Sequence, residues 1–338
     1  MIARALCLVL LLGGLSACSD GPDRAERPVR ILLVGDSVTQ GSAGDWTWRY
    51  RLWEHLRDAG VDLVGPDQTM AGPPPGPASL HYADPDFDRD HAARWGKSFV
   101  DTDWTIAQLV DVFHPDVVVE LLGVNDAVWG GVPASRLLDR ARDFVEQAQA
   151  ADPDVDVVLG ELPQTWYAAV PAYDAGLRGL ADRLGTERSR VVVADAPADF
   201  RRDVDTYDPV HPSASGEVKI AAAVADALAG LGIGSPYPRP LPDVPPVPVE
   251  PAVLTARPRA GAAQLRWEAP PGGWTAYVWR RDTTRGEEWQ RLPLGVPGPS
   301  WKAEGLIDGD TYEFRLQMAK GTSVSEVYSN VVTVVPAS

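Results

Sequence analysis

The sequence contains very little cysteine, and what it has lies at one end. Cys7 and Cys18 are the only cysteines among 338 residues. If the leader is removed, Cys7 is lost with it and Cys18 alone can remain, so we expect no disulfide, no thiolate metal site and no thiol nucleophile. The motif His-Glu-x-x-His is also missing, and the chain has only five histidines. We therefore expect neither a metal nor another cofactor.

Positive charge is scarce as well. The chain has 31 Lys and Arg against 47 Asp and Glu, which gives a formal net charge of −16 and a pI of about 4.7. Such an acidic surface repels phosphate groups, so we expect no nucleic-acid partner. Anionic lipid headgroups would be repelled too, and membrane attachment would therefore need something other than surface charge.

The N-terminus has the pattern of an export signal. Arg4 precedes the apolar run 5–12, which is too short to span a bilayer and suits the core of a signal peptide. The segment that ends in Ser16-Ala17-Cys18 resembles a bacterial lipobox, in which the cysteine is acylated; an ordinary secretory signal is the alternative. We expect residues 1–18 to be a lipoprotein signal peptide with Cys18 as lipidation site, and residues 19–28 a tether. The protein would be anchored to the outer face of the cell membrane, or secreted.

Residues 29–232 alternate between short β-branched runs and amphipathic helical stretches. The expected strands are 29–34, 61–64, 116–122, 155–159 and 190–194, and the expected helices are 48–58, 104–113, 135–151, 172–184 and 216–229. Apolar strands that alternate with helices predict a doubly wound, flavodoxin-like α/β domain with a parallel five-stranded sheet. The carboxyl ends of its strands are where a site is expected.

The last third of the chain has a different pattern. Residues 233–250 are rich in proline and predict a semi-rigid linker. Residues 251–336 show alternating apolar and polar positions separated by turns, which predicts a small all-β sandwich. Trp267, Leu306 and Tyr312 give this part a resemblance to fibronectin type III domains, and the resemblance implies a spacer.

Four short motifs lie at the ends of the expected elements. Ser37 follows Gly-Asp directly after the first strand, where it would be exposed at the start of a helix. Asp208 precedes His211 by three positions, so its carboxylate can orient the imidazole. Asn125 follows the third strand, where its amide is suited to stabilise an oxyanion, and the backbone N–H groups of Gly96 and Ser37 are further candidate donors.

In this order the motifs resemble those of the SGNH hydrolases, also called GDSL esterases. The resemblance covers residues 29–230 and implies a serine ester hydrolase without a cofactor or metal. It assigns Ser37, His211 and Asp208 to a catalytic triad, and Ser37, Gly96 and Asn125 to the oxyanion hole. The segment 94–98 departs from the family, because it lacks the second small residue that often accompanies the glycine.

Other residues compete for these roles. His91 also follows an aspartate, Asp88, at three positions, but it lies in a charged insertion and not after the fifth strand, so we favour His211. Asp36 and Asp126 are expected to hold loops by hydrogen bonding. The motif Gly-x-Ser-x-Gly is absent, which argues against an α/β-hydrolase elbow.

Tryptophans beside the motifs indicate the substrate. The segments 46–53 and 60–65 resemble the carbohydrate acetyl esterase branch of the family, which acts on acetylated xylan. Trp46, Trp95 and Trp129 are expected to stack on sugar rings, although core packing would also explain them. The favoured function is removal of O-acetyl groups from a carbohydrate. The alternatives are a lysophospholipase, lipase or thioesterase of the same fold, and a non-catalytic surface binding protein.

Overall fold

A computed structural model describes residues 27–72 and 76–337. The predicted signal peptide, Cys18 and nearly all of the predicted tether lie outside the described residues. Within the described ranges, no helix has the length and apolar character needed to cross a membrane.

The first domain is built on a parallel sheet with strand order β2-β1-β6-β7-β8. These strands are β1 (Val29–Gly35), β2 (Val61–Val64), β6 (Val117–Leu121), β7 (Asp156–Gly160) and β8 (Val191–Ala194). Each coincides with a predicted strand to within two residues at either end. The order, with the chain reversing direction across the sheet after β2, confirms the flavodoxin-like α/β fold.

A sixth strand, β5 (Ala92–Ala93), was not predicted. It pairs in parallel with the last two residues of β1, Val34 and Gly35, beyond the point at which β2 has ended. Two residues are too few to show a periodic pattern, so this strand has no detectable signal in the sequence. The strand matters because it delivers the segment that follows, residues 94–98, to the carboxyl end of β1.

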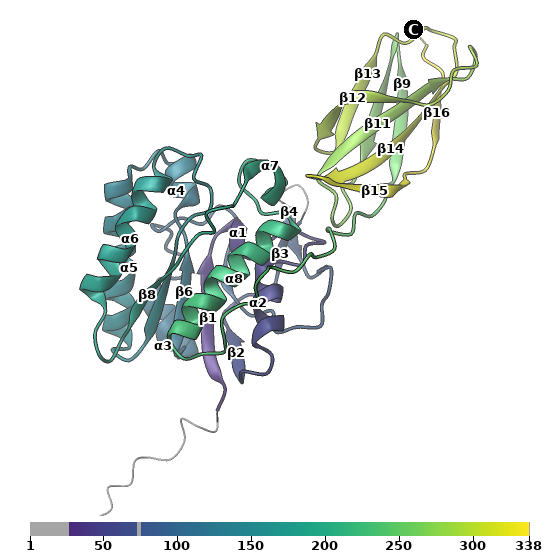
Figure 1. Ribbon diagram of the computed structural model, residues 1–338. Coiled ribbons are helices and arrows are strands. Elements are labelled where there is room, and N and C mark those ends of the chain that lie inside the picture. Colours follow the sequence, from purple (N-terminus) through teal and green to yellow (C-terminus); the bar gives the residue numbers. More distant parts are fainter. Residues whose placement is uncertain (1–26, 73–75, 338) are drawn as a thin grey trace, which may run out of the picture.

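Helices cover both faces of the sheet (Figure 1). The five predicted helices are α2 (Trp48–Leu56), α3 (Ile106–Phe113), α5 (Ala134–Ala151), α6 (Val170–Leu184) and α8 (Ala214–Gly230), and three short ones are added: α1 (Ser37–Gln40), α4 (Val124–Val128) and α7 (Arg202–Asp205). Helix α3 starts later than predicted because Thr105 and Gln108 form a capping box in front of it.

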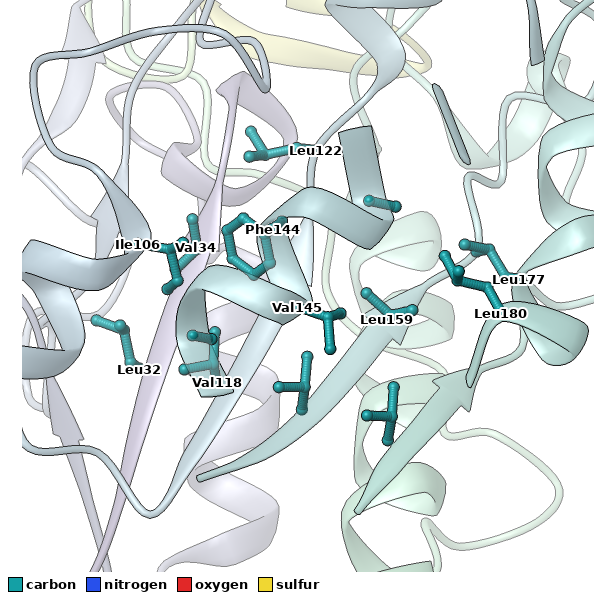
Figure 2. Packing of buried hydrophobic residues seen from close by; sticks show 14 of the residues in the cluster. Leu32, Val34, Ile106, Val118, Leu122, Phe144, Val145, Leu159, Leu177 and Leu180 are labelled. Atoms are coloured by element: carbon teal, nitrogen blue, oxygen red, sulfur yellow. The ribbon is translucent and has the colours of Figure 1, made fainter. Parts of the chain in front are cut away.

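Two apolar cores hold this domain together, one on each face of the sheet. Side chains of α3, α5 and α6 pack on one face, and side chains of α2 and α8 pack on the other. Figure 2 shows part of the first core, where Leu32, Val118 and Leu159 from three neighbouring strands meet Val145 and Leu177 from the helices. Burial of each such side chain contributes about 1.5–3 kcal/mol to the stability of the folded state.

The insertion between β2 and β5 packs against α2. It contains a small hairpin of β3 (Met70–Gly72) and β4 (Gly76–Ser79), outside the main sheet. Met70, Tyr82 and Phe87 form a separate apolar cluster against Tyr50 and Trp53 of α2. Tyr82 and Phe87 therefore attach this insertion to α2, whereas Leu80 and His81 are exposed.

The C-terminal domain consists of two antiparallel sheets packed on each other, which confirms the predicted β-sandwich. One sheet contains β9 (Leu254–Arg259), β10 (Ala262–Trp267) and β13 (Ser300–Glu304), and the other contains β11 (Thr275–Asp282), β12 (Gln290–Pro297), β14 (Tyr312–Lys320), β15 (Ser323–Tyr328) and β16 (Val332–Val334). Trp267, Leu306 and Tyr312 lie in its core. The fibronectin type III resemblance stays a prediction.

Candidate active site

Ser37 is held at the carboxyl end of β1 by a tight strand-to-helix turn. Gly35 is required there, because a Cβ atom on it would lie 2.1 Å from the hydroxyl oxygen of Thr39. Asp36 then caps α1 by accepting a hydrogen bond from the Val38 N–H at 2.9 Å. Burial raises the pKa of Asp36 to about 7. Its contacts fit the predicted role of holding the loop.

The structure brings Ser37, His211 and Asp208 into one hydrogen-bonded chain. His211 Nε2 lies 2.8 Å from Ser37 Oγ, and His211 Nδ1 lies 2.8 Å from Asp208 Oδ2. With Nδ1–H donating to the carboxylate, Nε2 is free to accept the serine proton. The arrangement has the geometry that a general base needs beside a hydroxyl nucleophile.

The carboxylate of Asp208 is itself fixed by its own loop. Its second oxygen, Oδ1, accepts hydrogen bonds from the backbone N–H groups of Val210 and His211, each at 2.8 Å. Burial by itself would raise the pKa of Asp208, but the hydrogen bonds and the His211 ring hold that pKa below its usual range. Asp208 is therefore ionised and oriented at neutral pH.

The residues that carry the other candidate oxyanion donors, Gly96 and Asn125, line the same cavity as Ser37. The Gly96 backbone has φ +79°, and a Cβ on it would meet no atom within 4 Å, so the backbone conformation and not the space favours glycine. One hydrogen of the Asn125 amide is donated to the Lys97 carbonyl at 3.0 Å. Because the amide carries two hydrogens, the other remains for a substrate oxygen.

An open cavity of about 680 Å³ lies over these groups. Its lining includes Ser37, His211, Gly96, Asn125, Trp95 and Trp129. Ser37, His211 and the residues that carry the candidate oxyanion donors thus face one space, which can admit a substrate.

The three predicted substrate-binding tryptophans have different positions. Trp95 stacks on His211, with ring centroids 4.2 Å apart and an interplanar angle of 25°. Trp129 is 76% exposed at the rim of the cavity. Trp46 is not part of the cavity lining; its ring packs against Tyr50 and lies 4.7 Å from the guanidinium of Arg51.

His91, the competitor of His211, has a structural position. Its ring is fully buried, Nε2 lies 3.0 Å from the Thr69 carbonyl oxygen, and Nδ1 accepts the Ala93 N–H. Burial lowers the pKa of His91 well below its usual value, so the ring is neutral. Asp88 accepts a hydrogen bond from the Leu63 N–H instead of orienting this ring.

Two residues that position the site were missed by the sequence analysis. Gln40 accepts the Trp95 N–H and so connects α1 to the Gly96 loop. Arg49 is fully buried and donates to the carbonyl oxygens of Thr39 and Gln40 at the end of α1. The available signal was an arginine on the apolar side of the first predicted helix after the serine motif.

The structure also shows the contacts of Asp126. Asp126 accepts a hydrogen bond from the Phe99 N–H and pairs with Arg140, which fits the predicted loop-holding role. Across residues 27–72 and 76–337, no group of three or more His, Cys, Asp or Glu side chains is arranged to hold a metal ion.

The comparisons with known proteins agree with this geometry. The model of the GDSL-like lipase/acylhydrolase family matches residues 33–218, more than half of the chain. Among solved structures, a carbohydrate esterase family 3 protein from Talaromyces cellulolyticus is 30% identical with a TM-score of 0.51, and the match covers 60% of this chain and 97% of that one. A mutant acetyl esterase with an acetate ion is 29% identical with a TM-score of 0.51 and the same coverage.

A family 3 carbohydrate esterase from Clostridium thermocellum has the same fold, at 24% identity and a TM-score of 0.50, with 61% of this chain and 97% of that one covered. None of the curated proteins matches the chain. The sheet order, the site at the carboxyl end of β1 and the family match lead to one conclusion: this chain is a carboxylic ester hydrolase that belongs to the GDSL-like lipase/acylhydrolase family.

Proposed function

We propose that the protein removes O-acetyl groups from a carbohydrate through a covalent acetyl-enzyme on Ser37. The observation that carries the chemistry is the hydrogen-bonded chain from Ser37 through His211 to Asp208, open to a cavity. His211 Nε2 takes the proton of Ser37 Oγ as that oxygen attacks the ester carbonyl. The Asp208 carboxylate stabilises the imidazolium that forms.

The negative charge on the carbonyl oxygen is stabilised by the backbone N–H groups of Ser37 and Gly96 and by the Asn125 amide. Such donors are most effective when they are fixed before the reaction. Two hydrogen bonds support this: Gln40 accepts the Trp95 N–H next to Gly96, and Asn125 donates to the Lys97 carbonyl. The tetrahedral intermediate then collapses, the C–O bond to the alcohol breaks, and His211 gives its proton to the departing oxygen. A water molecule, deprotonated by His211, attacks the acetyl-enzyme in the same way and releases acetate and free Ser37.

The acetylated carbohydrate is supported by two kinds of observation. The chain is similar to a carbohydrate esterase and to an acetyl esterase with an acetate ion, at 30% and 29% identity. Trp95 and Trp129 also line the cavity, and the exposed face of Trp129 is available to a sugar ring.

The test is hydrolysis of p-nitrophenyl acetate, butyrate and octanoate, and release of acetate from acetylated xylan. Ser37→Ala is the matched control, because it removes one oxygen and leaves the Ser37 backbone N–H in place. We expect turnover that is selective for acetate, release of acetate from the glycan, and loss of both in Ser37→Ala.

Each other result contradicts a separate part of the proposal. A preference for octanoate would indicate a lipid substrate, and the assignment of Ser37 as nucleophile would be unaffected. Activity that survives Ser37→Ala would contradict the acyl-enzyme mechanism. Absence of activity on every ester would favour the binding-protein alternative.

We also propose that the protein is an exported lipoprotein acylated at Cys18. The support is the sequence Leu15-Ser16-Ala17-Cys18 after an apolar run. Expression in a bacterium fed a labelled fatty acid tests this, with Cys18→Ser as the control. We expect label in the wild-type protein only, and an unlabelled wild-type protein would contradict the proposal.

A further inference from the structure

The β-sandwich domain is in close backbone contact with the α/β domain. The Gly272 N–H donates to the Ala43 carbonyl at 2.7 Å. A Cβ on Gly44 would lie 2.1 Å from the Gly272 nitrogen, and a Cβ on Gly321 would lie 2.7 Å from the Tyr207 Cα atom. Glycine is therefore needed on both sides of the contact, as expected where two backbones approach closely.

A buried ion pair connects the two domains. Lys320, at the end of β14, is 1% exposed at its side chain and pairs with Asp45 of the α/β domain, which is 4% exposed. The ammonium also lies 2.5 Å from the Ser42 hydroxyl and 4.4 Å from the centroid of the Tyr207 ring. A buried charge without its partner is costly, so this contact favours one orientation of the domains.

Docking in this orientation brings Trp274 of the β-sandwich to the catalytic histidine. Trp274 directly precedes β11, and its backbone N–H donates to the Ala319 carbonyl at 3.0 Å. The centroid of its ring lies 6.2 Å from that of His211, 6.0 Å from that of Trp95 and 5.1 Å from that of Tyr207. Figure 1 shows the sandwich extending from the end of the α/β domain where α7 lies.

The two sides of the site have different tasks in ester cleavage. The acyl oxygen must lie at the donors of Gly96 and Asn125, on the cavity side. The departing alcohol must lie at His211 Nε2, because that nitrogen protonates it. An aromatic ring close to His211 is therefore a candidate to contact the alcohol portion of the substrate. Trp274 is such a ring: it is only half-buried, and it lies close to His211 but outside the lining of the cavity that contains the candidate oxyanion donors.

We propose that Trp274 is a substrate-binding residue that stacks on the sugar bearing the acetyl group, so that the β-sandwich domain completes the active site instead of acting as a spacer. The inference rests on the proposed function, since the alcohol portion is then a sugar ring. Tryptophan offers a large, flat apolar face that suits the C–H face of a pyranose.

The test uses the full chain with Trp274→Ala and compares acetylated xylo-oligosaccharides with p-nitrophenyl acetate. We expect the ratio of kcat/KM for the glycan to kcat/KM for p-nitrophenyl acetate to fall at least about tenfold, mainly through a higher KM for the glycan. Trp279→Ala is the matched control: this tryptophan lies on β11, and its ring packs on Tyr328 and Arg315 within the sandwich. It is expected to leave the ratio unchanged.

A second variant tests whether a loss in Trp274→Ala is caused by misfolding. Trp274→Leu keeps apolar volume against Tyr207 but removes the flat ring, and it should lower the ratio as Trp274→Ala does. An unchanged ratio in both variants would overturn the proposal. An equal loss on both substrates would overturn it too, because Trp274 would then act by positioning His211. A wild-type protein that cleaves p-nitrophenyl acetate but releases no acetate from glycan would refute the carbohydrate assignment itself.

Discussion

The side-chain oxygen of Gln40 accepts a hydrogen bond from the backbone N–H of Trp95, with donor and acceptor 2.7 Å apart. Gln40 is the last residue of α1, which begins at Ser37, and Trp95 directly precedes Gly96. The other end of the Gln40 amide donates to the Thr69 carbonyl at 3.3 Å. Gln40 therefore fixes the distance between the proposed nucleophile and a proposed oxyanion donor.

Gln40→Ala should lower kcat for p-nitrophenyl acetate by about 10- to 100-fold and change KM little, because the Gly96 N–H loses its fixed position. Gln108→Ala is the control, since the Gln108 side chain also accepts a backbone N–H, but at the start of α3. It should reduce stability without lowering kcat. Equal kcat values for Gln40→Ala and the wild type would contradict the positioning role.

Asp208→Asn tests the orientation of His211. An amide in place of the carboxylate can donate to Nδ1 and so favours the tautomer with the proton on Nε2, which cannot accept the proton of Ser37. We expect kcat to fall by up to about ten-thousand-fold, as in other serine hydrolases with this change, while the fold is kept. Circular dichroism checks the fold. A loss of less than about tenfold would show that another carboxylate orients His211.

We expect Arg49 to contribute to both the free energy of unfolding and kcat. Its guanidinium donates to the carbonyl oxygens of Thr39 and Gln40 in the protein interior, and to the hydroxyl of Tyr82 in the insertion. Lysine cannot reproduce this fork of donors, so Arg49→Lys should cost about 3 kcal/mol of unfolding free energy and lower kcat. Arg57→Lys, an exposed arginine just after α2, is the matched control and should change neither. Urea denaturation and ester hydrolysis measure the two effects; a stable, fully active Arg49→Lys variant would contradict this role.

The features that could be predicted are those with a repeating or local pattern. Runs such as Val117–Leu121 identify buried parallel strands, and the place of Asp208 and His211 after the fifth strand indicates their contact. The three-residue spacing alone does not, because Asp88 and His91 share it and do not pair. Gln40 and the two-residue strand β5 could not be predicted, because their roles arise from tertiary contacts between segments far apart in the chain. For Arg49 the only signal was its place on the apolar side of a helix, which did not indicate its partners. Trp46 shows a related limit: its place next to the serine motif did not indicate that its side chain lies outside the cavity lining.

The proximity of Trp274 to His211 could not be predicted from the sequence either. It depends on how two domains dock, and that is decided by close glycine contacts and by the pair of Lys320 with Asp45, which lie 275 positions apart. The proline-rich linker before the β-sandwich is typical of a spacer module, and this composition gives no information about which surface the module contacts in the folded protein.

The buried carboxyl group of Asp174 should make the free energy of unfolding depend on pH. It lies on α6 and accepts the Leu162 N–H, and burial raises its pKa to about 7. The unfolded chain releases this proton near pH 4, whereas the folded protein keeps it until about pH 7, so the contribution of Asp174 to stability falls as pH rises between these values and is constant above. Asp174→Asn keeps the acceptor and removes the titration.

The difference in unfolding free energy, Asp174→Asn minus wild type, should therefore increase by up to about 2–3 kcal/mol from pH 5 to pH 8. Urea denaturation at both pH values measures it. Asp182→Asn is the control, because it changes an exposed aspartate of the same helix. A difference that stays the same at the two pH values would contradict a raised pKa for Asp174.

Lys320→Met should destabilise the docked arrangement of the two domains. It leaves the Asp45 carboxylate buried with only the Ser42 hydroxyl and backbone N–H as partners, and an unpaired buried charge costs about 3–5 kcal/mol. The predicted linker, residues 233–250, should then be cleaved faster in limited proteolysis. Lys302→Met, which removes an exposed lysine of the same domain, should have little effect. The double variant Lys320→Met/Asp45→Asn should recover part of the loss, because no buried charge remains unpaired; a double variant as unstable as Lys320→Met would show that packing of the lysine stem, and not the ion pair, holds the domains together.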